Sequence, residues 1–178
     1  MKKTLFLILT CFIFGLTYSQ EKNKIIFDTI CEKDVLIGNC DRTGLRSEIF
    51  EEYFSEEYSN YKPKSSVIRK IKPKLKDIEI VIVLGTWCGD SKEQLGRFYK
   101  ILDQLNFNEN NLSLICVDRS KSARKVDINE FEIERVPTFI FFENGKEIGR
   151  IIETPQASLE KDMLMILELR VDELLNIK

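Results

Sequence analysis

The sequence predicts an α/β fold, and three observations support that prediction. An apolar, β-branched run from Ile78 to Leu84 has the composition of a buried strand. The run stops at Gly85, and the residues from Cys88 to Leu105 then carry apolar side chains at the spacing of one helical face. A second apolar strand follows at 112–117. A strand, a helix and a strand in this order form a right-handed crossover between parallel strands.

The C-terminal third predicts a hairpin and a last helix. A strand at 139–142 is followed by Asn144-Gly145, which is a strong hairpin-turn signal, and by a second strand that ends at Ile152. Residues 126–133 predict a short helix before this hairpin. Apolar side chains between Leu159 and Leu174 predict an amphipathic helix at the C-terminus.

The first residues have the pattern of a targeting segment. Lys2 and Lys3 precede an apolar run over 5–16, and small residues at 17–19 flank a cleavage site. The apolar run is short for a membrane span. We therefore expect residues 1–19 to be a cleaved signal peptide and the protein to be periplasmic or secreted.

We interpret residues 20–76 as an N-terminal extension. It is expected to pack on the main domain, which is formed by residues 77–178. The extension begins with a candidate edge strand at 25–27. The segment from Leu45 to Phe54 has the apolar spacing of a helix, which we expect to cover one face of the sheet, and a docking helix for a partner is the alternative. A basic stretch at 62–76 predicts a short solvated helix.

Composition excludes several classes of function. The 178 residues contain no histidine, which excludes Ser-His-Asp and Cys-His catalysis and removes the commonest metal ligand. The formal net charge of −2 gives no reason to expect a nucleic-acid partner. Neither a phosphate-binding glycine loop nor a dinucleotide fingerprint is present, so we expect no cofactor and no metal.

Cys88 is the candidate nucleophile. It lies between the strand that ends at Leu84 and the helix that follows, and therefore at a helix N-terminus. Unpaired backbone N–H groups and the positive end of the helix dipole favour a thiolate at this position.

The segment 87–91, Trp-Cys-Gly-Asp-Ser, resembles the active-site turn of thioredoxins, and Val136-Pro137-Thr138 with the hairpin after it resembles their C-terminal half. The resemblance implies a thioredoxin-like fold, with a central mixed β-sheet flanked by helices on both faces. It also implies that Pro137 is cis and faces Cys88. By the same resemblance, substrate would contact six residues: Trp87, Gly89, Asp90, Val136, Pro137 and Thr138.

Ser91 is the main departure from the thioredoxin pattern, because thioredoxins carry a second, resolving cysteine at this position. A dithiol enzyme uses that thiol to break its own mixed disulfide. The chain is therefore similar to single-cysteine thioredoxin-family proteins of bacterial envelopes. We expect Ser91 to support catalysis by hydrogen bonding to the Cys88 thiolate.

The other cysteines leave alternatives open. Cys31 and Cys40 are close enough in sequence to form a structural disulfide. The alternatives are a redox-active pair that exchanges with Cys88, and two free thiols. Cys116 lies inside an apolar strand and is expected to be a buried small side chain.

The predicted function is thiol-disulfide exchange through Cys88, with disulfide-bearing or thiol-bearing proteins as partners. The resolving thiol would come from a low-molecular-weight thiol, a second protein, or the pair Cys31 and Cys40. Two alternatives are a thioredoxin-fold binding module with an idle thiol, and a trap or chaperone that forms long-lived mixed disulfides.

Overall fold

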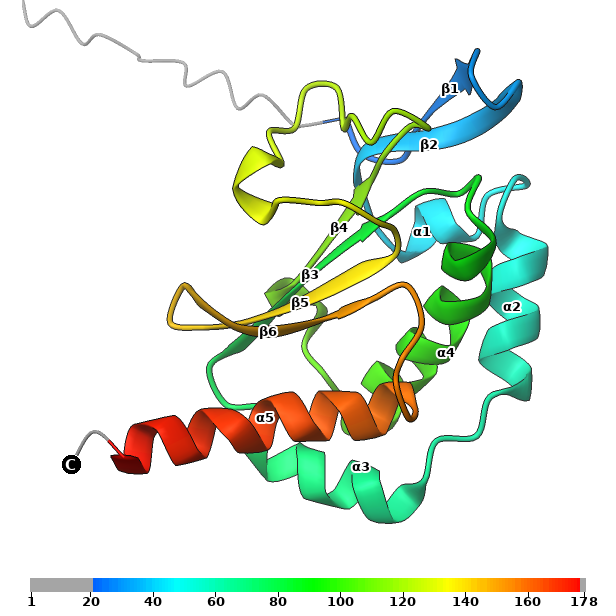
Figure 1. The fold of residues 1–178 in the computed structure, drawn as a ribbon. Helices are drawn as coiled ribbons and strands as arrows, with labels where there is room; N and C mark the ends of the chain where they lie inside the picture. The colour runs from blue at the N-terminus through cyan, green and yellow to red at the C-terminus, as the bar shows by residue number, and fades with distance from the viewer. Residues whose placement is uncertain (1–20, 177–178) are drawn as a thin grey trace, which may run out of the picture.

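A computed structural model describes residues 21–176, so the expected signal peptide lies outside the described residues. The strands form one six-stranded sheet in the order β1-β2-β4-β3-β5-β6 (Figure 1). β3 and β4 are parallel, and every other neighbouring pair is antiparallel, which confirms the predicted crossover and the mixed sheet. The strands are β1 Lys24–Asp28, β2 Lys33–Cys40, β3 Ile78–Leu84, β4 Leu112–Cys116, β5 Thr138–Glu143 and β6 Lys146–Ile152.

The α-helices pack on one face of this sheet. Their buried side chains share a single apolar cluster with Ile80 and Ile82 of β3, and Phe98 of the central helix lies 4.4 Å from the Phe139 ring of β5, centroid to centroid. None of the helices in the described part of the chain is long and apolar enough to cross a membrane. The helices are α1 Arg42–Leu45, α2 Glu51–Asn60, α3 Ser65–Ile71, α4 Gly89–Leu105 and α5 Leu159–Asn176.

The opposite face is covered by the segment 117–136. Side chains alternate between the two faces along a strand, so Val83 points away from the helices and contacts this segment through Ala123 and Ile128. Its regular element is the short 3-10 helix η3, Asn129–Phe131, where a short helix is expected at 126–133. Both faces are therefore covered, the second one by this segment with its 3-10 helix.

The N-terminal extension contributes two strands to the sheet as well as helices. β1 is the edge strand expected at 25–27. β2 pairs antiparallel with β4 and was not predicted, because its buried run at 35–37 is short. The helix expected from Leu45 to Phe54 is divided into α1 and α2. The basic stretch folds as α3 followed by the 3-10 helix η1, Lys72–Lys74.

Candidate active site

Cys88 is the N-cap residue of α4, immediately after the turn that follows β3. Its backbone is extended (φ −85°, ψ 133°), and its N–H donates to the Gly85 carbonyl at 2.9 Å. The Cys88 carbonyl accepts from the N–H of Lys92 at 3.1 Å, which begins the helical pattern. The expected position of the thiol at the N-terminus of a long helix is confirmed, and the residue is partly exposed.

The Cys88 thiol faces the segment that precedes β5. β5 pairs antiparallel with β3 and aligns Thr138 with Val83, so the start of β5 lies beside the end of β3. The Cys88 Sγ is 3.1 Å from the Val136 carbonyl oxygen, to which the thiol donates. The peptide bond between Val136 and Pro137 is cis, as expected. Two segments almost fifty residues apart in sequence thus meet at one sulfur atom.

Ser91 forms its hydrogen bond with the backbone and not with the thiol in this structure. Its side chain is fully buried, and its hydroxyl oxygen accepts a hydrogen bond of 3.3 Å from the backbone N–H of Gly85. The expected hydrogen bond between Ser91 and the Cys88 sulfur is therefore not formed. The hydroxyl oxygen is engaged by Gly85, the residue that follows β3.

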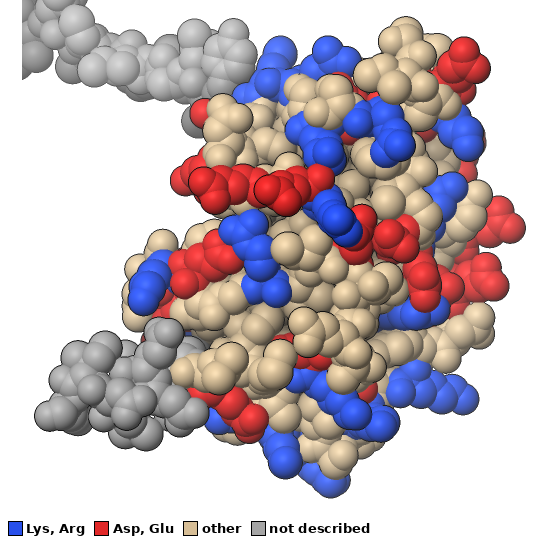
Figure 2. All heavy atoms as spheres, in the orientation of Figure 1, with Lys and Arg blue, Asp and Glu red and all other residues tan. Residues whose placement is uncertain are grey.

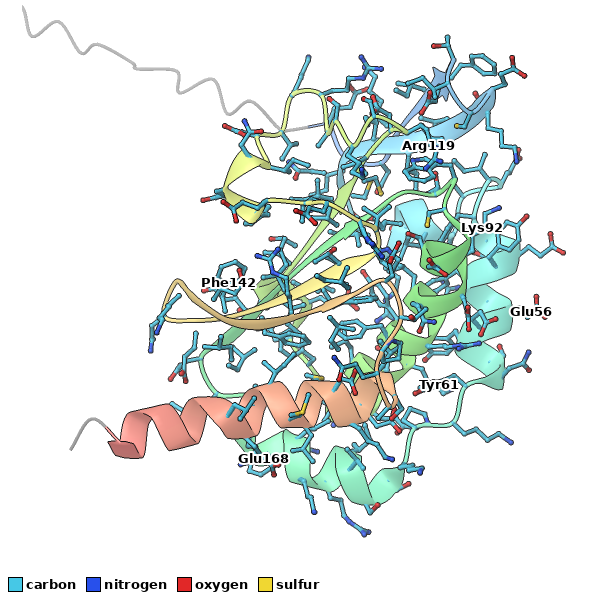
Figure 3. All side chains as sticks on the ribbon, in the orientation of Figure 1. Glu56, Tyr61, Lys92, Arg119, Phe142 and Glu168 are labelled. Carbon is cyan, nitrogen blue, oxygen red and sulfur yellow. The ribbon has the colours of Figure 1, made fainter. Side chains whose placement is uncertain are left out.

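Trp87, the residue before Cys88, makes three contacts that fix its side chain. Its indole Nε1 donates to the Val117 carbonyl at 3.0 Å. The indole also folds over Gly85, where a Cβ atom would lie 2.6 Å from Nε1, so only glycine leaves room for the ring. The Arg119 guanidinium lies over the ring at 4.5 Å from its centroid. Figure 3 shows Arg119 at the end of the molecule where α4 begins.

Asp28 fixes the backbone of Arg119. The Asp28 carboxylate is 4% exposed and accepts a hydrogen bond of 2.6 Å from the Arg119 N–H and one of 2.8 Å from the Ile30 N–H. The bond from Arg119 is the main reason that the pKa of Asp28 is below its ordinary value. Sequence reasoning found neither Asp28 nor Arg119, because no local pattern connects the end of β1 with the loop after β4.

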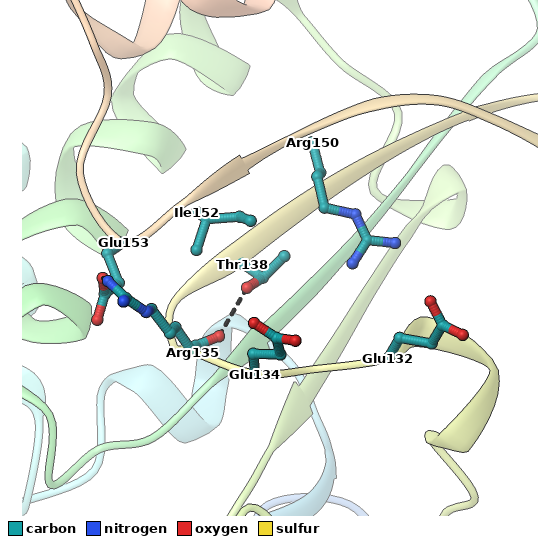
Figure 4. Close-up of a pocket in the computed structure, with 7 residues that line it drawn as sticks. All are labelled: Glu132, Glu134, Arg135, Thr138, Arg150, Ile152 and Glu153. Carbon is teal, nitrogen blue, oxygen red and sulfur yellow. Dashed lines mark hydrogen bonds and ion pairs between the residues drawn. The ribbon is translucent and has the colours of Figure 1, made fainter.

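The segment 136–138 is more enclosed than the sequence suggests. Val136 is 3% exposed, Thr138 is 2% exposed, and Pro137 is also buried. The Thr138 hydroxyl donates to the Arg135 carbonyl at 2.7 Å (Figure 4), so this side chain stabilises the turn. The exposed or partly exposed residues of the predicted site are Trp87, Cys88, Gly89 and Asp90.

A pocket of about 430 Å³ is lined in part by Thr138. Its charged side chains largely neutralise one another. The Arg135 guanidinium is 2.8 Å from the Glu153 carboxylate, and Arg150 pairs with Glu147. The lining residues are Glu132, Glu134, Arg135, Thr138, Arg150, Ile152 and Glu153 (Figure 4).

The comparison with protein families decides how this geometry is classified. The thioredoxin family model matches residues 64–165, which is more than half of the chain. The chain belongs to the thioredoxin family. The match includes β3, Cys88, α4 and the segment before β5, and it begins after β1 and β2. No similar sequence was found among the curated proteins.

The solved structures that match the chain share little sequence with it. A protein of unknown function from Pseudomonas aeruginosa is 17% identical, with 67% of this chain and 82% of that chain covered and a TM-score of 0.48. Thioredoxin O2 from Arabidopsis thaliana is 16% identical over 61% and 84%, with a TM-score of 0.35. Mitochondrial thioredoxin 3 from Saccharomyces cerevisiae is 20% identical over 66% and 98%, with a TM-score of 0.34.

The two cysteines before the family match, Cys31 and Cys40, are free thiols in this structure. Cys31 lies in the turn between β1 and β2, and Cys40 ends β2. A strand of eight residues separates them. Because a strand rises about 3.3 Å per residue, its ends lie more than about 20 Å apart. A disulfide needs Cα atoms within about 7 Å.

The thiols of this thioredoxin-family chain other than Cys88 lie in different environments. Burial, followed by the negative charge of Asp28, raises the pKa of Cys31. Cys116 is completely buried beside Cys40, and burial raises its pKa well above the ordinary thiol value. This agrees with the expectation that Cys116 is a buried small side chain. Among residues 21–176, no group of three or more His, Cys, Asp or Glu side chains is arranged to hold a metal ion.

Proposed function

We propose that this thioredoxin-family protein is a thiol-disulfide oxidoreductase that acts through the single nucleophilic thiol of Cys88. The observation that carries the proposal is the position of this thiol. It is partly exposed at the N-cap of a 17-residue helix, and it lies 3.1 Å from the Val136 carbonyl. The positive end of the helix dipole favours negative charge on this sulfur. Membership in the thioredoxin family supports disulfide-bearing or thiol-bearing proteins as the substrates.

In the first step, the Cys88 thiolate attacks one sulfur of a substrate disulfide. A bond forms between Cys88 Sγ and that sulfur, the substrate S–S bond breaks, and the other substrate sulfur leaves as a thiolate that takes up a proton. The thiol proton that now contacts the Val136 carbonyl is lost before the attack. Trp87 and Gly89 form the surface on which the substrate approaches.

In the second step, an external thiolate attacks Cys88 Sγ of the mixed disulfide, and the substrate sulfur leaves as a thiolate that takes up a proton. A second external thiol then attacks the external sulfur of the new disulfide and releases the Cys88 thiolate, so two external thiols are oxidised to a disulfide while the substrate disulfide is reduced to two thiols. The Ser91 hydroxyl cannot perform this step and is bonded to Gly85. Cys40 and Cys116 are buried, and Cys31 lies in the β1-β2 turn beside Asp28. We therefore assign the resolving role to a low-molecular-weight thiol or to a second protein.

We also propose that the protein is exported. The pattern of residues 1–19 supports a cleaved signal peptide, which would place the protein in the periplasm or outside the cell. Disulfide substrates are abundant in such oxidising compartments. Mass spectrometry of the protein isolated from its native cell fractions would test both statements. A mature N-terminus at residue 1 in the cytosolic fraction would contradict them.

The function is tested by the reactivity of each cysteine. We expect iodoacetamide at pH 7 to alkylate Cys88 faster than it alkylates free cysteine, with the modified residue identified by mass spectrometry. We expect the protein to reduce a peptide disulfide in the presence of a low-molecular-weight thiol, and Cys88→Ser to abolish this activity. The variant Cys31→Ser is the matched control and should retain it. A Cys88 that reacts no faster than free cysteine and gives no turnover would leave only a docking role for the fold.

A further inference from the structure

We infer that Arg119 and Lys92 make the Cys88 site selective for disulfides flanked by acidic residues in a peptide substrate. This inference rests on the proposed function and names its substrate class. It begins from two cations at the end of the molecule that carries Cys88. Figure 3 labels both of them near the N-terminus of α4.

Arg119 approaches the site from the loop that follows β4. Its guanidinium lies over the ring of Trp87, the residue before Cys88, 4.5 Å from the ring centroid. This contact with an uncharged ring does not neutralise the positive charge. A guanidinium binds a carboxylate with two parallel hydrogen bonds. Arg119 is exposed and is therefore available to bind a carboxylate.

Lys92 is the second cation, four residues after Cys88. It lies in the first turns of α4, where its backbone N–H donates to the Cys88 carbonyl. Its Nζ is 3.8 Å from the centroid of the Tyr53 ring of α2. Like Arg119, this cation is positioned by an aromatic ring, so its charge is not neutralised by the contact that holds it.

The carboxylates close to Arg119 are engaged elsewhere. Asp28 is buried and accepts from two backbone N–H groups, one of them that of Arg119 itself. Asp118 forms its ion pair with Arg124 at 3.2 Å. Among the described residues, no carboxylate forms an ion pair with the side chain of Arg119 or Lys92. Asp90 is the one acid within the motif 87–91.

The charged groups close to Cys88 determine the electrostatic field there, because the molecule as a whole carries little net charge. Acidic and basic side chains are interspersed over the visible face of the molecule (Figure 2). The formal net charge is only −2. Because exposed charges are screened within about 10 Å at ordinary ionic strength, groups close to the thiol dominate the field that a bound peptide meets. Arg119 and Lys92 are therefore the residues that select its charge.

The experiment compares three disulfide-linked peptides that differ only in the residues next to cysteine, which are Glu, Gln or Lys. We expect the protein to reduce the Glu peptide fastest and the Lys peptide slowest. Arg119→Gln and Lys92→Gln should each lower the rate for the Glu peptide by about threefold to fivefold. Each should lower the rate for the Gln peptide by a smaller factor than the rate for the Glu peptide. The differences should shrink at high salt.

Lys100→Gln is the matched control. Lys100 lies on the same helix as Lys92 and also packs on a tyrosine, with its Nζ 4.4 Å from the Tyr58 ring centroid, but two turns farther from Cys88. This variant should leave all three rates unchanged. Equal rates for the three peptides with the unmodified protein would overturn the inference and leave the proposed oxidoreductase function intact.

A binding measurement keeps the inference testable if the protein shows no turnover. Trp87 is the only tryptophan in the chain, so intrinsic fluorescence reports directly on this surface. We expect titration of Cys88→Ser with the three peptides to give the tightest binding for the Glu peptide, and Arg119→Gln to remove that preference. Indistinguishable affinities would overturn the inference, whatever the activity of Cys88.

Discussion

The Asp28 carboxylate accepts a hydrogen bond of 2.6 Å from the backbone N–H of Arg119, although the two residues are 91 positions apart in the sequence. This contact connects the first strand of the sheet with the loop that carries the guanidinium above Trp87. The N-terminal hairpin, β1 and β2, therefore supports the surface around Cys88 as well as extending the sheet. The family match begins at residue 64, so the hairpin lies outside the matched segment, whereas Arg119 lies inside it.

The Asp28 contact predicts a pH dependence of stability. Its pKa is lowered in the folded protein, mainly by the Arg119 hydrogen bond, so the ionised carboxylate stabilises the fold at neutral pH. That contribution is lost as pH falls from the ordinary carboxyl value of about 4 through the lower folded value. We expect Asp28→Asn to lower the free energy of unfolding at pH 7 and to have a smaller effect at pH 3, as measured by urea denaturation. The control is Asp34→Asn, because Asp34 is an exposed residue of β2. This substitution should change the free energy of unfolding little at either pH.

Ser91 is predicted to stabilise the turn and not to activate the thiol. Ser91→Ala removes the acceptor of the Gly85 N–H in a buried position, which should cost about 1 to 3 kcal/mol of unfolding free energy. The alkylation rate of Cys88 at pH 7 should stay within about twofold of that of the unmodified protein, a difference of less than about 0.5 kcal/mol. Urea denaturation and timed alkylation check the two parts separately. A large loss of Cys88 reactivity with unchanged stability would return Ser91 to the catalytic role expected from the sequence.

Gly96 is predicted to be required for the contact between α2 and α4. A Cβ atom at this position would lie 2.6 Å from the Tyr58 backbone nitrogen and would also meet the Phe54 carbonyl oxygen. Alanine usually stabilises a helix relative to glycine, but here it would force the two helices apart. We expect Gly96→Ala to lower stability by about 1 to 3 kcal/mol in thermal or urea unfolding. Gly89→Ala, where no atom lies within 4 Å of the added Cβ, should be neutral or slightly stabilising.

Cys31 is predicted to be a free and slowly reacting thiol. Burial and the charge of Asp28 raise its pKa, so fewer molecules carry the thiolate at neutral pH. Alkylation of Cys31 at pH 7 should be slower than that of free cysteine, and Asp28→Asn should accelerate it. Cys31→Ala should leave the melting temperature unchanged under oxidising and reducing conditions alike. A fall in melting temperature confined to oxidising conditions would reveal a disulfide that this structure does not contain.

The sequence alone predicted the central unit of the fold and the position of its thiol. The change from a β-branched run to helical spacing at Gly85 is a local pattern, and it correctly placed Cys88 at the N-terminus of α4. The Val-Pro-Thr segment was correctly expected to face Cys88, because its resemblance to the thioredoxin pattern carries the relation between the two segments. The serine at position 91 also follows from the sequence alone, and it determines that this motif holds one thiol.

The tertiary structure decided the contacts that depend on strand register. Cys31 and Cys40 are near neighbours in sequence, yet extended strand β2 separates them, and a spacing in residues does not distinguish an extended chain from a closed loop. Arg119 and Asp28 have no shared local pattern, because only the pairing of β2 with β4 brings the hairpin beside the loop after β4. The surroundings of Cys88 were therefore determined by packing between distant segments, whereas the turn that holds it was determined by residues adjacent in the chain.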